Sequence, residues 1–386
     1  MLEREAMAIL VSALPMRYSR RAAALKQAGS ALGVIADPYA FADRLTQDGA
    51  AAVQRAVRES ERILEGIYDA GVHLIVLGEE GYPQLLAQIP HPPHLLFVQG
   101  NADLTDALKA AVVGTRRASE YGLRHTRRMA AELAGAGVCI VSGLALGIDA
   151  AAHEGALDVR GRTIAVLGSA LDRFYPPENR GLRDRILDVG GSVISEYPMG
   201  TSHTRYSFLE RNRIIAGLSM GVLVTDGPQR SGALRTANDA ADYGREVFAL
   251  PGSVDAPGSQ LPHKLIAEGA HLVTCGADVL CVLAPQLAQQ IRAEKKQEEP
   301  KRKTKSAAKK ETPREEAPKQ AVMPIPEGIG SEERAVLEAL AAGEKEFDEL
   351  SEETAIDAMT LGAVLMGLEM DGLIDALPGL RYARRA

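Results

Sequence analysis

AAVVGTRRASEYGLRHTRRMAAELAGAGVCIVSGLALGID, residues 110–149, places two short apolar runs on either side of an amphipathic stretch at residues 120–136. The first apolar run ends at Gly114 and the second at Gly143. Short apolar strands that alternate with helices are typical of a parallel sheet whose two faces are both covered. This stretch therefore predicts a strand, a helix and a second parallel strand of a doubly wound α/β domain.

The same alternation extends on both sides of this stretch. Downstream, as far as residue 283, lie the apolar runs TIAVLG, SVIS, GVLVT, EVFAL and HLVT. Upstream, the runs VHLIVL from Val72 and HLLFV from His94 are short and end at or near glycine, so we expect them to be strands as well. Residues 71–285 are therefore predicted to form an extended Rossmann-like, mostly parallel sheet.

Three other regions differ in composition. Residues 1–70 place apolar side chains at helical spacing, which predicts a small helical domain. Residues 286–325 carry charge runs, alanine and proline with almost no large apolar side chain, as is typical of a disordered basic linker. Residues 326–386 contain three helical stretches followed by LIDALPGLRYARRA, which has the pattern of a hairpin. Helices followed by a two-stranded wing indicate a winged-helix domain.

Composition excludes several classes of protein. No apolar run approaches the ~20 residues of a membrane helix, and the start MLEREAMAIL is too acidic and too weakly apolar for a secretory signal. We therefore expect a cytoplasmic protein. The cysteines, Cys139, Cys275 and Cys281, lack CxxC spacing and lie in apolar surroundings, which favours buried thiols over a disulfide framework or a zinc site.

The formal net charge of −7 is spread unevenly along the chain. Residues 327–386 hold 14 acidic and 5 basic side chains, whereas residues 291–320 hold 6 acidic and 11 basic ones. The first 290 residues are therefore close to neutral. A nearly neutral domain can still present a local basic patch, and the local field matters more for phosphate binding than the total charge.

Four turns in residues 110–240 have the residues that bind anions. GTRR from Gly114 and SGLALGID from Ser142 each join a strand to a helix start, where backbone N–H groups and the helix dipole attract a phosphate. RNR from Arg211 follows on a helix, and SGALRTA from Ser231 opens another helix beside Arg230. Arginine binds phosphate in bidentate geometry, and asparagine can bind a base edge. Four such turns at one sheet edge fit an extended polyanion better than a single phosphate.

Catalytic interpretations are weaker. His153 follows Asp149 by four residues, but no third ligand has suitable spacing, so a helix-capping Asp and a hydrogen-bonded His are favoured over a metal or acid–base pair. Ser142 and Ser231 have no nearby base for nucleophilic catalysis. Glu196 could act as a general base, but a pair with an arginine such as Arg213 is favoured. Neither GxGxxG nor GxxxxGK[ST] occurs in the glycine loops, so no nucleotide cofactor is indicated. We therefore predict no catalytic residues, no metal and no cofactor.

Several motifs along the chain resemble those of a known family. GYPQLLAQIPHPPHLLFVQGN, VVGTRRASEYG, VSGLALGIDAAAH, TIAVLGSALDRFYPPENR, SVISEYPMG, FLERNRIIAGLS, SGALRTA and REVFALPG occur in the order and spacing of the DprA/Smf proteins. The resemblance implies an N-terminal helical (SAM-like) domain, an extended Rossmann core and a C-terminal winged helix. It also implies a dimer that binds single-stranded DNA, protects it, and loads the RecA recombinase during natural transformation.

The resemblance also implies a set of DNA-binding residues. It combines the anion-binding turns with Phe208, which either stacks on a base or belongs to the core. Two positions depart from the family, which usually has Glu where Asp226 stands and Ser or Thr where Ala233 stands. The predicted DNA-binding residues are Gly114, Thr115, Arg116, Arg117, Ser142, Gly143, Arg205, Phe208, Arg211, Asn212, Arg213, Ser231, Gly232 and Arg235.

Two alternatives remain at this stage. One is a nucleotide-binding enzyme or carrier on a related Rossmann scaffold, such as a LOG-type phosphoribohydrolase or a molybdenum-cofactor carrier, although their PGGxGT-type turn is not found here. The other is that the acidic C-terminal module mainly binds protein partners.

Overall fold

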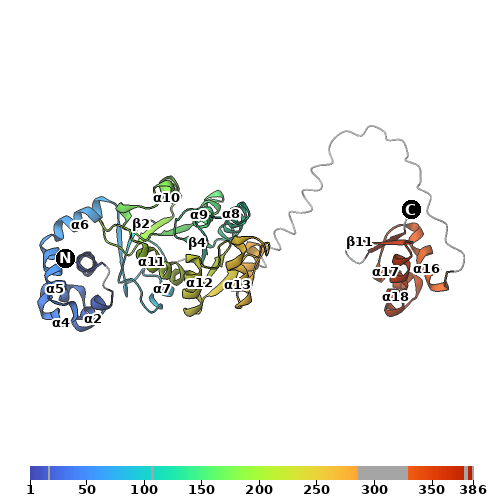
Figure 1. Cartoon of the computed structure of the whole chain (residues 1–386), viewed down its shortest axis with the longest axis horizontal. Coiled ribbons are helices and arrows are strands. Elements are labelled where there is room, and N and C mark those ends of the chain that lie inside the picture. Colours follow the sequence, from blue (N-terminus) through green and yellow to red (C-terminus); the bar gives the residue numbers. More distant parts are fainter. Residues whose placement is uncertain (16–17, 106–107, 286–328, 378–380, 385–386) are drawn as a thin grey trace, which may run out of the picture. The chain divides into compact units, whose positions relative to one another are not determined.

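The computed structural model of the chain describes residues 1–15, 18–105, 108–285, 329–377 and 381–384 (Figure 1). The chain forms two compact units, Met1–Lys305 and Ser306–Ala386. The predicted linker at residues 286–325 lies outside the described residues. No helix in the described ranges has both the length and the apolar character needed to cross a membrane.

The first unit is built on a mixed sheet whose order is β1-β2-β6-β5-β4-β3-β7-β8-β9. From β6 through β5, β4, β3, β7 and β8 to β9, each strand is parallel to the next, whereas β2 is antiparallel to both β1 and β6. The predicted mostly parallel sheet is thus confirmed. The strands are β1 (His73–Val76), β2 (Leu95–Gly100), β3 (Lys109–Val113), β4 (Cys139–Ser142), β5 (Thr163–Val166), β6 (Ser192–Ser195), β7 (Gly221–Val224), β8 (Glu246–Ala249) and β9 (His271–Leu272).

Both faces of this sheet are covered because its central strands are apolar on both sides. In β3, Ala110 and Val112 pack into one core, and Ala111 and Val113 into the other. Figure 1 shows one row of helices along each face of the sheet. One row comprises α8 (Glu120–Gly135), α9 (Ile148–Asp158), α10 (Arg180–Asp188) and α14 (Gly276–Leu283). The other comprises α7 (Gln84–Ala87), α11 (Arg205–Leu218), α12 (Gly232–Asp242) and α13 (Gln260–Ala267).

The direction in which strands are added reverses at β3. From β3 the chain builds β4, β5 and β6 outward on one side, and α11 then leads to β7, which pairs with the opposite side of β3. At such a switch point the connections leave the sheet in opposite directions, which opens a crevice at the carboxyl ends of the strands. The ends of β3 and β7 therefore lie at the position where open α/β sheets bind ligands.

The N-terminal helices belong to the same unit as the sheet. The apolar side of α1, which includes Ile9 and Leu10, shares one core with Leu95 and Phe97 of β2. Helices are present here as predicted, and they extend the core of the sheet beyond its β1 end. They are α1 (Glu3–Ala13), α2 (Tyr18–Ala28), α3 (Ala31–Ala36), α4 (Ala42–Leu45), α5 (Gln47–Arg58) and α6 (Ser60–Asp69).

The second unit contains three helices and a small antiparallel sheet, as predicted for a winged helix. The helices are α16 (Ser331–Ala339), α17 (Phe347–Thr354) and α18 (Ala358–Met370). The strands β10 (Lys345–Glu346), β11 (Ile374–Leu377) and β12 (Arg381–Arg384) pair in the order β10-β12-β11. A separate core that includes Leu337, Leu350 and Leu365 holds this unit together.

The cysteine prediction is only partly right. Cys139 is buried in β4, but Cys275 and Cys281 are partly exposed, and none of the three forms a disulfide. Cys275 precedes α14 and Cys281 lies on that helix, which belongs to the outer part of the domain. Cys281 packs against the core on one side of the sheet but stays partly exposed.

Candidate functional site

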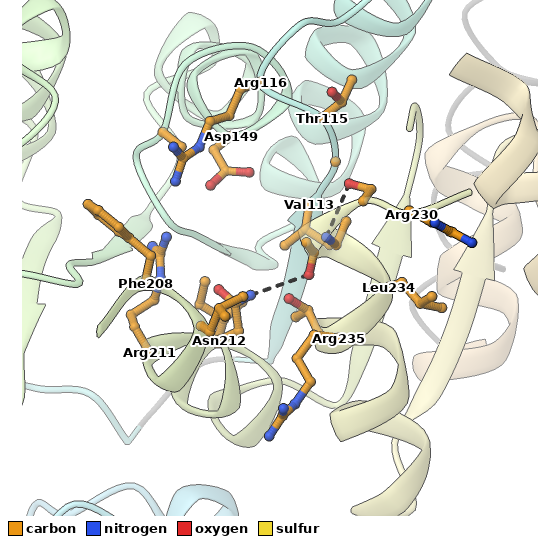
Figure 2. Close-up of a pocket in the computed structure, with 18 of the residues that line it drawn as sticks. Val113, Thr115, Arg116, Asp149, Phe208, Arg211, Asn212, Arg230, Leu234 and Arg235 are labelled. Carbon is orange, nitrogen blue, oxygen red and sulfur yellow. Dashed lines mark hydrogen bonds between the residues drawn. The ribbon is translucent and has the colours of Figure 1, made fainter. Parts of the chain in front are cut away.

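A pocket of about 970 Å³ lies at the switch point of the sheet. Its walls come from the end of β3 with the following turn, from α11, and from residues 228–238, which connect β7 to α12 and form its first turns. Figure 2 shows Arg116 and Phe208 on one side of the pocket and Arg230 on the other. Segments that are far apart in sequence thus form one concave surface.

The turn after β3 is held by contacts on both sides. Thr115 N–H donates to the backbone oxygen of Asp226 at 2.9 Å, and Ile148 N–H donates to the backbone oxygen of Thr115 at 3.2 Å. A Cβ on Gly114 would lie only 2.6 Å from the Asp226 oxygen, so this close approach requires glycine. The rigid turn leaves the next two side chains, Arg116 and Arg117, exposed at the pocket.

Asp226 also fixes the start of α8. Its Oδ2 accepts hydrogen bonds from the N–H group of Ser119 at 3.0 Å and from the Ser119 hydroxyl. Ser119 in turn caps α8 by accepting from Gly122 N–H at 3.0 Å. This buried carboxylate therefore joins the end of β7 to the arginine-bearing turn, a role that the sequence analysis did not assign to it.

One wall of the pocket is aromatic. The guanidinium carbon of Arg116 lies 5.2 Å from the ring centroid of Phe208, within the range of a cation–π contact. The rings of Tyr175 and His203 stand 4.2 Å apart, and each lies 5.6 Å from Phe208. Phe208 is therefore a partly exposed lining residue rather than core. Tyr175 and His203 were missed, because neither lies in a glycine turn and only the fold brings them beside Phe208.

Arg211 forms the floor of the pocket. It is 4% exposed and donates to the backbone oxygen of Val166. Burial lowers the pKa of Arg211 to about 10, and Asp149 opposes this shift. Burial also raises the pKa of Asp149, against the opposing charge of Arg211. Gly143 leaves the space for this guanidinium, since a Cβ there would collide with it. Arg211 thus supports the pocket from beneath instead of extending into solvent.

Ser142 and Arg213 lie outside the lining of this pocket. Ser142 is fully buried, and its hydroxyl donates to the backbone oxygen of Val112 at 2.6 Å. Arg213 forms an ion pair with Glu196 at 2.5 Å, with their side chains only 16% and 10% exposed. Burial lowers the pKa of Arg213, but Glu196, together with Tyr197 and Glu210, outweighs burial, so that the net shift is upward. The pairing of Glu196 with Arg213 that the sequence analysis favoured is confirmed.

The opposite wall begins at the loop after β7. Ser231 caps α12, and its Oγ accepts from Ala233 N–H at 3.2 Å. Asn212 reaches across from α11 and donates to the backbone oxygen of Gly232 at 3.4 Å. Arg235 pairs with Asp239 at 3.0 Å, so part of its charge is compensated. Arg230 is exposed.

The arginines of the pocket therefore divide into two groups. Within the described ranges, no carboxylate lies at ion-pair distance from Arg116, Arg117 or Arg230, whereas Arg235 has such a partner. The side chain of Arg205, which begins α11, lies outside the described part of the structure. The predicted residues that line the pocket are Gly114, Thr115, Arg116, Arg117, Phe208, Arg211, Asn212, Ser231, Gly232 and Arg235. Gly143 lines a small adjoining recess together with Arg116, Tyr175 and Phe208.

The surroundings of His153 indicate a structural role. It is fully buried, and its Nδ1 lies 2.7 Å from the hydroxyl of Thr163. Burial lowers the pKa of His153 to about 3, so the ring stays neutral. In the part of the chain that the structure describes, no group of three His, Cys, Asp or Glu side chains is arranged to hold a metal ion. The favoured interpretation of His153 as a hydrogen-bonded side chain is confirmed, whereas the expected helix cap by Asp149 is wrong, because Gly147 is the N-cap residue of α9 and no side chain caps it.

Comparisons with known proteins place these features in a family. Residues 73–284 match the family described as DNA recombination-mediator protein A, and residues 312–379 match the DprA winged helix domain. Protein Smf of Synechocystis is 39% identical over 311 residues, which cover 79% of this chain and 78% of that protein. The DNA processing protein DprA of Streptococcus pneumoniae is 48% identical over 202 residues, which cover 52% of this chain and 71% of that protein.

A solved structure agrees with these sequence matches. The X-ray structure of DprA from Streptococcus pneumoniae is 35% identical and superposes with a TM-score of 0.62. The superposition covers 73% of this chain and 98% of that one.

Proposed function

Because this chain belongs to the family of DNA recombination-mediator protein A, as its motifs predict, we propose that it binds single-stranded DNA in the pocket at the switch point of its sheet. The observation that carries the proposal is the pairing of uncompensated arginines with an aromatic wall in one pocket. Arginines would bind phosphates, and the aromatic wall would bind bases.

The arginines favour a ligand with several phosphates. Arg116 and Arg230 stand on opposite sides of the pocket, and the capped N-terminus of α12 also lines it. Separate cationic groups along one concavity match repeated backbone phosphates, and the positive end of a helix dipole adds to this attraction. A mononucleotide would leave one end of the pocket without a ligand.

The aromatic wall favours single strands over duplexes. Rings stack on a base only when that base has left its own stack, which an unpaired strand allows at little cost. Phe208, Tyr175 and His203 are partly exposed or exposed and lie within 6 Å of one another between ring centroids. Direct contacts are assigned to Arg116, Arg117, Phe208, Asn212 and Arg230. Arg211 and Gly143 shape the floor.

The proposal includes a non-catalytic mode of action. Glu196, the strongest candidate for a general base, is held by Arg213 and lies outside the pocket lining. A base must reach the proton that it abstracts, and this carboxylate is already occupied by a cation. We assign the pocket to binding rather than to nucleotide hydrolysis.

The proposed function also includes two protein partners. The family description names a recombination mediator, and this supports RecA, loaded onto single-stranded DNA during natural transformation, as the protein partner. β9 ends the sheet with exposed residues, and open sheet edges are pairing surfaces, which supports a homodimer through the Rossmann-like domain. A RecA partner supports a location in the cytoplasm. Light scattering and RecA filament assembly on DNA test these two assignments.

The DNA assignment is tested with the full chain and labelled oligo-dT of about 20 nucleotides, compared with a duplex of equal length. We expect tighter binding to the single strand, and an affinity that falls steeply between 50 and 200 mM salt. Arg116→Ala should lower the affinity and reduce the salt slope by roughly 0.7, the loss expected for one phosphate contact. Phe208→Ala should cost about tenfold, since stacking is worth roughly 1–3 kcal/mol per base.

Arg62→Ala is the matched control, because Arg62 is an exposed arginine on α6, paired with Glu59 and distant from the pocket lining. It should leave the affinity unchanged. Binding that ignores salt, or that survives both pocket substitutions intact, would overturn the proposal.

A further inference from the structure

A second concavity of about 640 Å³ lies beside the pocket, between α8 and α9. Its α8 side is formed by Glu120, Leu123, Arg124 and Arg127, whose spacing places them on one face of the helix. Its α9 side is formed mostly by small residues, from Gly147 to Glu154. We call this surface the α8–α9 groove.

The α8–α9 groove adjoins the pocket. Arg116 and Arg117 line both concavities, so the turn after β3 is the border between them. A chain that crosses the pocket past Arg230 and Arg116 would enter the groove without leaving basic surface. This arrangement provides a track longer than the pocket.

The charge of the groove is predominantly basic. Four arginines and two glutamates line it. Arg127 is occupied, because it pairs with Asp158 at 2.5 Å and with Glu154 at 3.4 Å. Arg124 is exposed, and among the described residues no carboxylate lies at ion-pair distance from it. Arg124 is therefore the uncompensated cation of the groove beyond the shared turn.

We propose that the α8–α9 groove is a second binding surface for the DNA backbone, on which Arg124 takes a phosphate of the strand that leaves the pocket at Arg116 and Arg117. The inference rests on the proposed function of the pocket. The groove lacks an aromatic lining residue, so it binds phosphates rather than bases. The groove extends the DNA-binding site on one side, and base stacking takes place only in the pocket.

An acidic protein segment is the competing occupant. A nucleic-acid strand is favoured because the groove shares Arg116 and Arg117 with a pocket that has stacking rings, which an acidic peptide does not need. The shared arginines also mean that one continuous ligand satisfies both concavities.

The test compares two lengths of oligo-dT on the full chain, about 5 nucleotides for the pocket alone and about 20 for pocket and groove together. Arg124→Ala should weaken the long oligonucleotide several-fold and reduce its salt slope by roughly 0.7, while the short one keeps its affinity. Arg124→Lys should restore most of the loss, because the phosphate contact needs charge. Glu154→Gln should strengthen long-strand binding, because it removes a negative charge from the groove, although Arg127 stays paired with Asp158.

Arg128→Ala is the control on the same helix, since Arg128 lies outside the groove lining and donates to the backbone oxygen of Thr274 at 2.6 Å. An equal loss with Arg128→Ala, or no loss with Arg124→Ala, would overturn the second surface while leaving the pocket intact. Weaker binding of a polyglutamate peptide to Arg124→Ala with unchanged DNA affinity would assign the groove to an acidic protein. Failure of both oligonucleotides to bind wild type would overturn the pocket and the groove together.

Discussion

The pocket of the first unit and the small sheet of the second unit hold their basic residues in different ways. Around the pocket of the first unit, Arg116, Arg117 and Arg230 are exposed and lack ion-pair partners within the described ranges. In the second unit, Arg381 donates to Glu344 at 2.8 Å, and Lys345 is held by Glu353. A cation that is already paired with a carboxylate gains less free energy from binding a phosphate. The two units should therefore differ in phosphate binding because of how their charges are paired, more than because of their net charge.

The two units also differ in the number of basic residues on α18 and α8. In winged-helix and related motifs the third helix commonly enters the DNA groove. Here that helix, α18, reads AMTLGAVLMGLEM and contains no Lys or Arg. In the first unit α8 reads EYGLRHTRRMAAELAG and carries several arginines beside the pocket. We expect the first unit to supply the DNA affinity, and the acidic second unit to contact a protein partner.

The largest difference should appear when one member of an ion pair is removed. Glu196→Ala leaves Arg213 buried without its partner, so the first unit should lose roughly 3–5 kcal/mol of unfolding free energy. Glu353→Ala in the second unit breaks a more exposed pair and should cost at most about 1 kcal/mol. Urea unfolding followed by circular dichroism measures both. Equal losses would remove the distinction between a buried and a surface pair.

The second largest difference should be in the loss of unfolding free energy at low pH, which we expect to be greater in the first unit. Burial, reinforced by Arg21, lowers the pKa of His94 to about 3, and burial lowers that of His153 to about 3 as well. The unfolded chain binds these protons near pH 6.5, so each histidine should cost about 1.4 kcal/mol per pH unit as the pH falls from 6.5 toward 3.

Residues 306–386 contain no histidine, so the second unit lacks this loss. The measurement is unfolding free energy from pH 7 to pH 5, and His94→Gln should flatten the slope of the first unit. A slope unchanged by His94→Gln would refute the assignment.

A matched pair of arginine substitutions tests the DNA contrast. Arg230→Ala removes an uncompensated charge from the pocket, and we expect a several-fold loss of oligo-dT affinity with a salt slope smaller by roughly 0.7. Arg381→Ala removes an arginine that already bonds to Glu344, and the affinity should not change. Fluorescence anisotropy at two salt concentrations gives both values. A loss with Arg381→Ala as large as that with Arg230→Ala would assign DNA contacts to the second unit.

The smallest effect is expected from removing the second unit. A chain that ends after residue 285 keeps the whole sheet, the pocket and the groove. Its affinity for oligo-dT should stay within about twofold of the full chain, because residues 327–386 hold 14 acidic and only 5 basic side chains and so attract phosphates weakly. Equilibrium titration of the two chains makes this comparison. A large loss would show that the acidic unit or the preceding residues bind DNA.

Much of the fold was predictable because the relevant signals are local. Each predicted strand of the sheet is present, since apolar runs such as AAVVG and GVLVT are too short for helices and end at turns. The sequence also predicted the wing formed by β11 and β12 and the helices that begin near Ser331 and Phe347. The partial exposure of Cys275 and Cys281 was not, because an apolar segment does not show which of its sides faces the core.

The site was predictable only in part, and RNR shows why. Consecutive helical residues point about 100° apart, so three neighbours cannot all face one pocket. Arg211 turns inward to the floor, Asn212 lines the pocket, and Arg213 turns away to Glu196. Sequence identifies arginines near a predicted ligand edge. It does not divide them into contacts and supports.

By itself, the sequence determined an α/β sheet with glycine turns at one edge, a helical start and a winged-helix end. These follow from periodicity and turn residues, which act within a few positions along the chain. Only the tertiary structure decided that Tyr175 and His203 stand beside Phe208, that Asp226 secures the turn of Arg116, and that Arg124 continues the basic surface. Such arrangements depend on contacts between segments distant in sequence, and the reversal of strand order at β3 brings those segments together.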